Sequence, residues 1–227
     1  MSFVSRGFRG RRRDSDVDPS RIPPGQYVTD DFPVLSAGPT PHTPLDEWTF
    51  EVVRKFAHNG FAAMSPHLYF RMGTGSADDL AARSRDAGGV SDDQVVGDVA
   101  ATANYLRSLP NSNGKVGVIG YCWGGYVAWM SASRLPGFAC AAPYYGGGML
   151  EASGERPRCP VLAHFGEQDS MIPVEGVRQF AAAHPEAQVL IYPANHGLNC
   201  DQRGSFDGSS AKLARERTLA FFRKHLG

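Results

Sequence analysis

The sequence predicts an α/β fold in which helices cover both faces of a mostly parallel sheet. Short, continuously apolar segments recur along the chain, as expected of strands that are buried on both sides. These segments alternate with longer stretches whose apolar residues recur at helical spacing. At 227 residues, the chain is long enough for one domain of this class with a sizeable core.

The regular elements are expected from residue 47 onward. An amphipathic helix covers residues 47–60 and ends at Gly60, and a buried strand with its exit loop lies within residues 61–70. A second helix is expected over residues 92–109, where apolar side chains recur along one face. The remaining strands are expected at 115–121, 140–146, 159–166 and 188–193, and the remaining helices from 124, at 174–184 and at 210–225.

Residues 1–46 differ in character from the rest. The stretch "SRGFRGRRRDSD" holds five arginines, and the residues after it are rich in proline and turn formers. Only residues 26–37, "QYVTDDFPVLSA", could form a strand. We therefore expect an Arg/Pro-rich leader over residues 1–46, partly disordered, and an α/β domain over residues 47–227. Phosphate binding by the arginines is the alternative interpretation.

Composition limits the possible partners. Lys plus Arg and Asp plus Glu both number 23, so no global field favours nucleic acid or a membrane. No apolar run approaches a membrane span, and the basic start lacks the apolar core of a signal peptide. The four cysteines show no metal-ligand spacing and are typical of reduced thiols, so we expect a cytoplasmic protein without a metal.

The stretch "GYCWGG" places a cysteine where a buried strand turns into a helix. A nucleophile at such a turn is held in a strained conformation, and side chains two positions away on either side would collide. Gly120 and Gly124 remove that collision. The helix N-terminus favours the thiolate of Cys122, and the Trp123 N–H could hold an oxyanion. A buried structural cysteine is the alternative.

Two later loops supply partners for this thiol. Asp169 follows the strand at 159–166, and His196 follows the strand at 188–193. The order nucleophile, acid, histidine is that of α/β-hydrolases. His196 could take the thiol proton while Asp169 orients the imidazole. Taken singly, Asp169 could cap a loop and His196 could be a surface residue. The other cysteines and histidines are interpreted as inert thiols and as surface or core-edge histidines: Cys140, Cys159, Cys200, His42, His58, His67, His164, His184 and His225.

From about Glu51 to Leu226 the chain resembles the dienelactone hydrolase family. The resemblance rests on "GFAAMSPHLYFR", "SNGKVGVIGYCWGG", "PYYGGG", "HFGEQDSMIP", "YPANHGLNCDQR" and "ARERTLAFFRKHL". It implies an α/β-hydrolase fold, no cofactor, and hydrolysis of the enol-lactone ring of carboxymethylenebutenolides through an acyl-enzyme. It places the nucleophile, acid and base on Cys122, Asp169 and His196. Arg71 would contact the substrate carboxylate, with Arg203 as a second candidate, although either arginine alone could be a solvated charge.

The N-terminal segment departs from that family. Ser36-Ala37-Gly38 stands where members carry a thiol-controlling glutamate, so the first strands are expected to be atypical or missing. Residues 22–50 resemble the start of sulfite-oxidase-like molybdopterin oxidoreductases. The cofactor-binding core and the molybdenum-ligating cysteine of that family have no counterpart in the later sequence. We expect a monomer or weak homo-oligomer acting on an anionic lactone or ester. The rival hypothesis is a catalytically impaired or binding domain.

Overall fold

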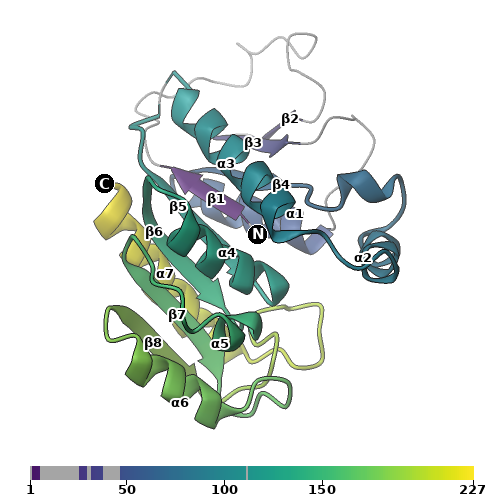
Figure 1. Cartoon of the computed structure of the whole chain (residues 1–227). Helices are drawn as coiled ribbons and strands as arrows, with labels where there is room; N and C mark the ends of the chain where they lie inside the picture. Colours follow the sequence, from purple (N-terminus) through teal and green to yellow (C-terminus); the bar gives the residue numbers. More distant parts are fainter. Residues whose placement is uncertain (1, 6–25, 30–31, 38–46, 111) are drawn as a thin grey trace. The chain divides into compact units, whose positions relative to one another are not determined.

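The computed structural model describes residues 2–5, 26–29, 32–37, 47–110 and 112–227. The chain divides into two compact units, Ser2–Gly114 and Lys115–Gly227, which are considered separately. The leader's arginine run falls outside the described residues. Both units combine strands with flanking helices, which confirms the predicted α/β class (Figure 1).

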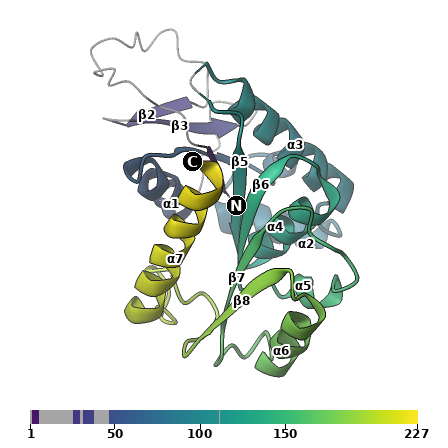
Figure 2. The ribbon, with the colours of Figure 1, turned by 90° about the vertical axis from the view of Figure 1, so that its left-hand side faces the viewer.

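The C-terminal unit contains four parallel strands that pair in chain order. The strands are β5 (Val116–Tyr121), β6 (Phe138–Tyr144), β7 (Val161–Gly166) and β8 (Ala187–Tyr192). The helices are α4 (Trp123–Arg134), α5 (Gly148–Glu151), α6 (Val174–Ala183) and α7 (Gly208–Leu226). Figures 1 and 2 show α7 on one face of these strands and α4 and α6 on the other. Because the strands are parallel, the loops that follow them meet at one edge.

The N-terminal unit is built around β4, which pairs with β3 in parallel and with β1 in antiparallel orientation. β2 pairs with β3 antiparallel. The strands are β1 (Ser2–Ser5), β2 (Gln26–Thr29), β3 (Phe32–Ala37) and β4 (Ala62–Pro66). The helices are α1 (Glu47–His58), α2 (Ala77–Asp86) and α3 (Asp92–Ser108), with a 3-10 turn at Phe70–Met72.

The start of the chain contributes more than the sequence led us to expect. β1 pairs Phe3 with Met64 and Val4 with Ala63, and the Val4 side chain is fully buried. A four-residue strand beside a run of arginines gives no periodic signal, which is why it was not predicted. Helix α2 was likewise not predicted. Ser76, the N-cap residue just before this helix, forms a reciprocal capping box with Asp79.

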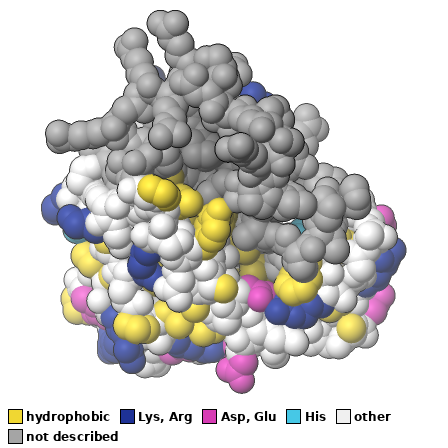
Figure 3. Space-filling view, turned by 90° about the horizontal axis from the view of Figure 1, so that it is seen from above, with side chains coloured by type: hydrophobic (Ala, Val, Ile, Leu, Met, Phe, Trp, Pro, Cys, Tyr) yellow, Lys and Arg dark blue, Asp and Glu magenta, His cyan; other side chains and the backbone are white. Residues whose placement is uncertain are grey.

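Each unit has an apolar interior. In the C-terminal unit the largest fully buried side chains include Trp129, Phe165 and Phe222, which come from α4, β7 and α7. Helices cover both faces of the strands, and these side chains are buried between the helices and the strands. Figure 3 shows one surface of the molecule, on which the described acidic, basic and hydrophobic side chains are interspersed.

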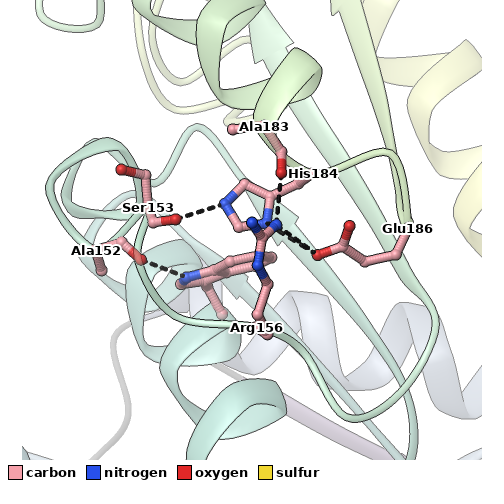
Figure 4. A network of polar contacts seen from close by, with 7 residues as sticks. Ala152, Ser153, Arg156, Ala183, His184 and Glu186 are labelled. Atoms are coloured by element: carbon pink, nitrogen blue, oxygen red, sulfur yellow. Dashed lines mark hydrogen bonds and ion pairs between the residues drawn. The ribbon is translucent and has the colours of Figure 1, made fainter.

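The amino end of β8 carries a polar network, called here the amino-end cluster, made by His184, Arg156 and Glu186 with the Ser153 carbonyl (Figure 4). The fully buried His184 donates from Nε2 to Ser153 O over 2.9 Å. Its Nδ1 lies 3.0 Å from both Arg156 Nη1 and Glu186 Oε1. The ring packs edge-on against Trp129, with centroids 4.9 Å apart.

Two histidines that the sequence suggested to be surface or core-edge residues are in fact fully buried. His184 belongs to the amino-end cluster, and His164 belongs to strand β7. His164 Nδ1 lies 2.8 Å from the Tyr192 hydroxyl and Nε2 lies 3.0 Å from Thr218 Oγ1. The prediction was wrong because polar partners distant in sequence satisfy both rings, which allows burial.

Candidate active site

Cys122 occupies a strained turn between β5 and α4. Its backbone lies at φ 55° and ψ −122°, a conformation that side chains rarely adopt, and the residue is exposed. A Cβ at Gly120 would lie 1.8 Å from the carbonyl oxygen of Gly124, so a side chain at position 120 cannot be accommodated. The glycine at position 120 is therefore required for the turn that holds Cys122 between strand and helix.

Neighbouring backbone groups hold this turn in place. The Cys122 N–H donates to the Tyr144 carbonyl over 3.0 Å, and the Cys122 carbonyl accepts from Gly125 N–H over 2.8 Å. A Cβ on Gly125 would come within 2.4 Å of the same Tyr144 carbonyl. The first turn of α4 therefore packs directly on the end of β6, and glycine allows the close approach.

Asp169 lies in the loop after β7, where its carboxylate is almost completely buried. Oδ1 accepts backbone N–H groups from Met171 and Ile172, over 2.8 and 3.0 Å. Oδ2 accepts the Nδ1–H of His196 over 2.8 Å. The end of β7 lies directly against the loop that follows β8. A Cβ on Gly166 would lie 2.3 Å from the Ala194 carbonyl, so glycine allows this close approach. These contacts fix the orientation of the carboxylate toward the imidazole.

His196 is held by one ring nitrogen and has the other one unbonded. The bond to Asp169 assigns the proton to Nδ1. Nε2 is buried and makes no hydrogen bond of standard geometry to the residues that the structure describes. The Cys122 thiol nevertheless lies close enough to be the largest influence on this ring: it raises the pKa of His196, and Asp169 raises it further against the effect of burial. In unliganded sites such contacts are often long.

The Cys122 thiol is shifted toward its ionised form. The neighbouring His196 lowers the pKa of Cys122, burial opposes this, and the Trp123 N–H and the positive charge of Arg203 lower it further. The other two shifted thiols behave in the opposite way, because burial raises the pKa of Cys159 to about 12 and also raises the pKa of Cys140. Since the thiolate is the nucleophile, Cys122 has the reactive environment and these two do not.

The two predicted substrate-binding arginines have different environments. Arg203 belongs to the same unit as Cys122, Asp169 and His196, and its charge acts on both Cys122 and Tyr145. Arg71 belongs to the N-terminal unit, where both terminal nitrogens of its guanidinium bind Asp98, over 2.6 and 2.9 Å. Arg71 also lies over the Phe70 ring at 4.1 Å. The fork of Arg71 is therefore already occupied by a carboxylate.

Sequence reasoning missed one residue of this site. Tyr145 follows β6, is buried, and packs its ring against that of His196 with centroids 4.9 Å apart. The sequence signal was present in "PYYGGG", where three glycines follow an aromatic pair at the end of a strand. All four parallel strands of the C-terminal unit thus deliver a residue to one edge: Cys122, Tyr145, Asp169 and His196.

Among the described residues, no group of three or more His, Cys, Asp or Glu side chains is arranged to hold a metal ion. Their helices also include none with the length and apolar character needed to cross a membrane.

Comparison with known proteins gives a consistent result. The model of the Dienelactone hydrolase family matches residues 45–226. A carboxymethylenebutenolidase of Pseudomonas putida is 34% identical over 184 residues, covering 75% of this chain and 77% of that protein. A candidate carboxymethylenebutenolidase of Yersinia pestis is 30% identical over 228 residues, covering 86% and 85%.

Solved structures extend the comparison. A candidate dienelactone hydrolase from Klebsiella pneumoniae superposes with a TM-score of 0.69 at 27% identity, covering 78% of this chain and 81% of that one. A dienelactone hydrolase-like promiscuous phosphotriesterase from metagenomic libraries gives a TM-score of 0.64 at 20% identity, with coverage of 81% and 82%. The α/β-hydrolase fold expected from the sequence is thus confirmed. The resemblance of residues 22–50 to molybdopterin enzymes stays a prediction.

Proposed function

Because the chain belongs to the dienelactone hydrolase family, we propose that it is a thiol-dependent carboxylic ester hydrolase that opens a lactone or ester through an acyl-enzyme on Cys122. The observation that carries the proposal is the exposed thiol at a strained turn, beside an imidazole whose other nitrogen is bound to a buried carboxylate. Nucleophile, base and orienting group are the parts that covalent acyl transfer needs.

In the first half-reaction, His196 Nε2 takes the proton of the Cys122 thiol. The sulfur then forms a bond to the carbonyl carbon and the π electrons move to oxygen. The Trp123 N–H, at the start of α4, would stabilise this oxyanion. When the intermediate collapses, the carbon–oxygen bond breaks and the leaving oxygen takes a proton from His196 Nε2. With a lactone, the released hydroxyl stays attached to the acyl group.

In the second half-reaction, water replaces the thiolate. His196 Nε2 takes a proton from water, whose oxygen bonds to the thioester carbon, and the carbon–sulfur bond breaks. The products are the free acid and the Cys122 thiolate. Asp169 keeps its bond to Nδ1 and stabilises the imidazolium, while two backbone hydrogen bonds hold the carboxylate in place.

The nucleophile assignment is tested with Cys122→Ala, using Cys159→Ala as the matched control. We expect Cys122→Ala to lose at least about a hundredfold in kcat on a chromogenic ester and on a dienelactone, since triad members act as a unit. Mass spectrometry of the wild type, quenched during turnover, should find the acyl group on Cys122. A Cys122→Ala variant that kept more than about a hundredth of wild-type kcat would contradict the proposal. No turnover by the folded wild type would favour the rival binding-domain hypothesis.

We further propose that the substrate is anionic. The support is the charge of Arg203 beside the Cys122 thiol, together with the relatives that are named carboxymethylenebutenolidases. Arg71 remains the second candidate, although a substrate carboxylate would have to displace Asp98 from its guanidinium. An arginine fork matches a carboxylate in geometry and charge, so either residue could select an acidic lactone.

Substrate charge separates the two arginines. We expect Arg203→Ala to lose about 2 kcal/mol in kcat/KM on an anionic lactone, the size of one charge-assisted contact, and little on a neutral ester. If Arg71 also binds substrate, Arg71→Ala should show the same selectivity. If Arg71 serves the fold, then Arg71→Ala and Asp98→Ala should lower the melting temperature alike and leave selectivity unchanged. Equal losses for Arg203→Ala on both substrates would refute its role in charge selection.

A further inference from the structure

Tyr145 is held in a backbone conformation that tyrosine rarely adopts. Its φ is 34°, and among the described non-glycine residues Cys122 alone shares a positive φ. Three glycines follow at positions 146–148, so this loop already contains residues suited to such a conformation. A strained residue persists where its surroundings over-determine it, and such residues cluster at functional sites. The tyrosine side chain must therefore contribute something that glycine could not.

The backbone around Tyr145 is fixed from two sides. Its N–H donates to the His164 carbonyl on β7 over 2.7 Å. A Cβ on the next residue, Gly146, would lie 2.6 Å from the backbone nitrogen of Tyr126 in α4. Tyr145 is thus confined between β7 and the helix that begins beside the nucleophile, and its ring has little freedom to move.

The side chain of Tyr145 contacts the loop after β8 at two points. Its ring lies against the His196 imidazole, with centroids 4.9 Å apart and planes inclined by 59°. Its hydroxyl donates to Oδ1 of Asn199, three residues further along the same loop. Burial raises the pKa of Tyr145 strongly, and nearby Cys200, Tyr144 and Cys122 act in the same direction, so the hydroxyl stays protonated and remains a donor.

We propose that Tyr145 is a positioning residue, whose ring and hydroxyl keep the His196 imidazole oriented with Nδ1 on Asp169 and Nε2 toward the Cys122 sulfur. One hydrogen bond to Asp169 fixes one ring atom and leaves the plane of the imidazole free to tilt. The flat face of Tyr145 limits that tilt, while the bond to Asn199 ties ring and loop together. The inference rests on the proposed roles of Cys122 and His196.

The test uses the thiol itself, so it does not depend on the natural substrate. The rate of Cys122 alkylation by iodoacetamide is measured from pH 5 to pH 9, with peptide mapping to locate the label. In Tyr145→Leu, a misaligned imidazole should stabilise the thiolate less, so the pH profile should move upward and alkylation at pH 6.5 should slow about tenfold. Tyr145→Phe and Asn199→Ala should each give a smaller shift, and the double variant should be no worse than either, because both remove the same hydrogen bond.

Tyr192→Phe is the matched control. It also removes a buried tyrosine hydroxyl in this unit, one that bonds to His164 rather than to the His196 loop. We expect it to lower the melting temperature without moving the alkylation profile. Wild-type profiles in both Tyr145 variants, or an equal shift in Tyr192→Phe, would overturn the inference while leaving the proposed function intact. If Tyr145→Leu fails to fold, the alkylation profiles of Tyr145→Phe, Asn199→Ala and the double variant decide whether Tyr145 positions the imidazole. If iodoacetamide does not label Cys122 in the wild-type protein, the proposed function itself is contradicted.

Discussion

Strand β8 has a histidine near each end, and the two are treated in opposite ways. His184, three residues before the strand, has both ring nitrogens paired and its side chain fully buried. His196, four residues after the strand, has Nδ1 bound to Asp169, while Nε2 has no hydrogen bond of standard geometry among the described residues. The structural imidazole is saturated with partners, and the candidate catalytic one keeps a nitrogen available for a proton.

The surroundings of the two rings differ in the same sense. The amino-end cluster packs His184 against Trp129 and Phe180, whose ring centroids lie 4.9 and 4.4 Å away. The carboxyl edge instead contains the two described non-glycine residues with positive φ, Cys122 and Tyr145. Well-satisfied packing stabilises a fold, whereas strain and an unpaired polar atom cost stability and persist where function requires them. Substitutions at the two ends should therefore separate activity from stability.

The largest expected effect is on activity at the carboxyl end. His196→Ala should lower kcat on a chromogenic ester at least about a thousandfold, because the thiol then lacks its general base and the leaving group its acid. The free energy of unfolding, from urea denaturation, should fall by no more than about 2 kcal/mol, because the loss of the Nδ1 bond to Asp169 is partly offset by the removal of a buried nitrogen without a standard hydrogen bond. Retained activity would mean that the unpaired Nε2 has no catalytic meaning.

At the amino end the effect should fall on stability. His184→Ala should lower the free energy of unfolding by about 3 kcal/mol, because it empties a site between two aromatic rings and strands polar partners. His184→Phe fills the space but loses the polar contacts, so we expect about half that loss. The kcat of both variants should match wild type after correction for folded protein. A large fall in kcat would show that the two ends of β8 are coupled.

The candidate triad could be predicted from the sequence because it obeys a local rule. Cys122, Asp169 and His196 each follow an apolar run, and the carboxyl ends of parallel strands meet at one edge. The glycines two positions before and after Cys122, Gly120 and Gly124, also predicted the turn. The family model and the fold comparison confirm the class that these patterns suggested.

What could not be predicted depends on pairing across the chain. The contacts of His184 with Ser153 and Arg156 span 31 and 28 residues, and a side chain's burial is decided by such partners. The ion pair of Arg71 with Asp98 spans 27 residues and has no periodic signature. Tyr145 was missed for a different reason, because a positive φ is expected of glycine and asparagine and not of tyrosine.

The smallest expected effect concerns the acid sensitivity of the amino-end cluster. The pKa of Glu186 is lowered to about 2, from an ordinary value of 4.5. The largest cause is a hydrogen bond from the backbone N–H of Glu186 itself, followed by the contacts with His184 and Arg156. A carboxyl whose pKa is lower in the folded protein contributes stability above its unfolded pKa and loses it on acidification, here between about pH 4.5 and pH 2. Because Glu186 is 37% exposed, solvent screening keeps this contribution below about 1 kcal/mol.

Glu186→Gln should therefore lower the free energy of unfolding slightly at pH 7 and lose less of it on acidification to pH 3, as measured by urea denaturation at each pH. The control is Glu167→Gln, which removes a more exposed carboxylate whose contact with Arg178 is longer, at 3.4 Å. Its acid dependence should follow that of the wild type. If Glu186→Gln also follows the wild type, the carboxylate adds nothing to the amino-end cluster, and the stability of that end comes from the buried His184 ring and its aromatic neighbours.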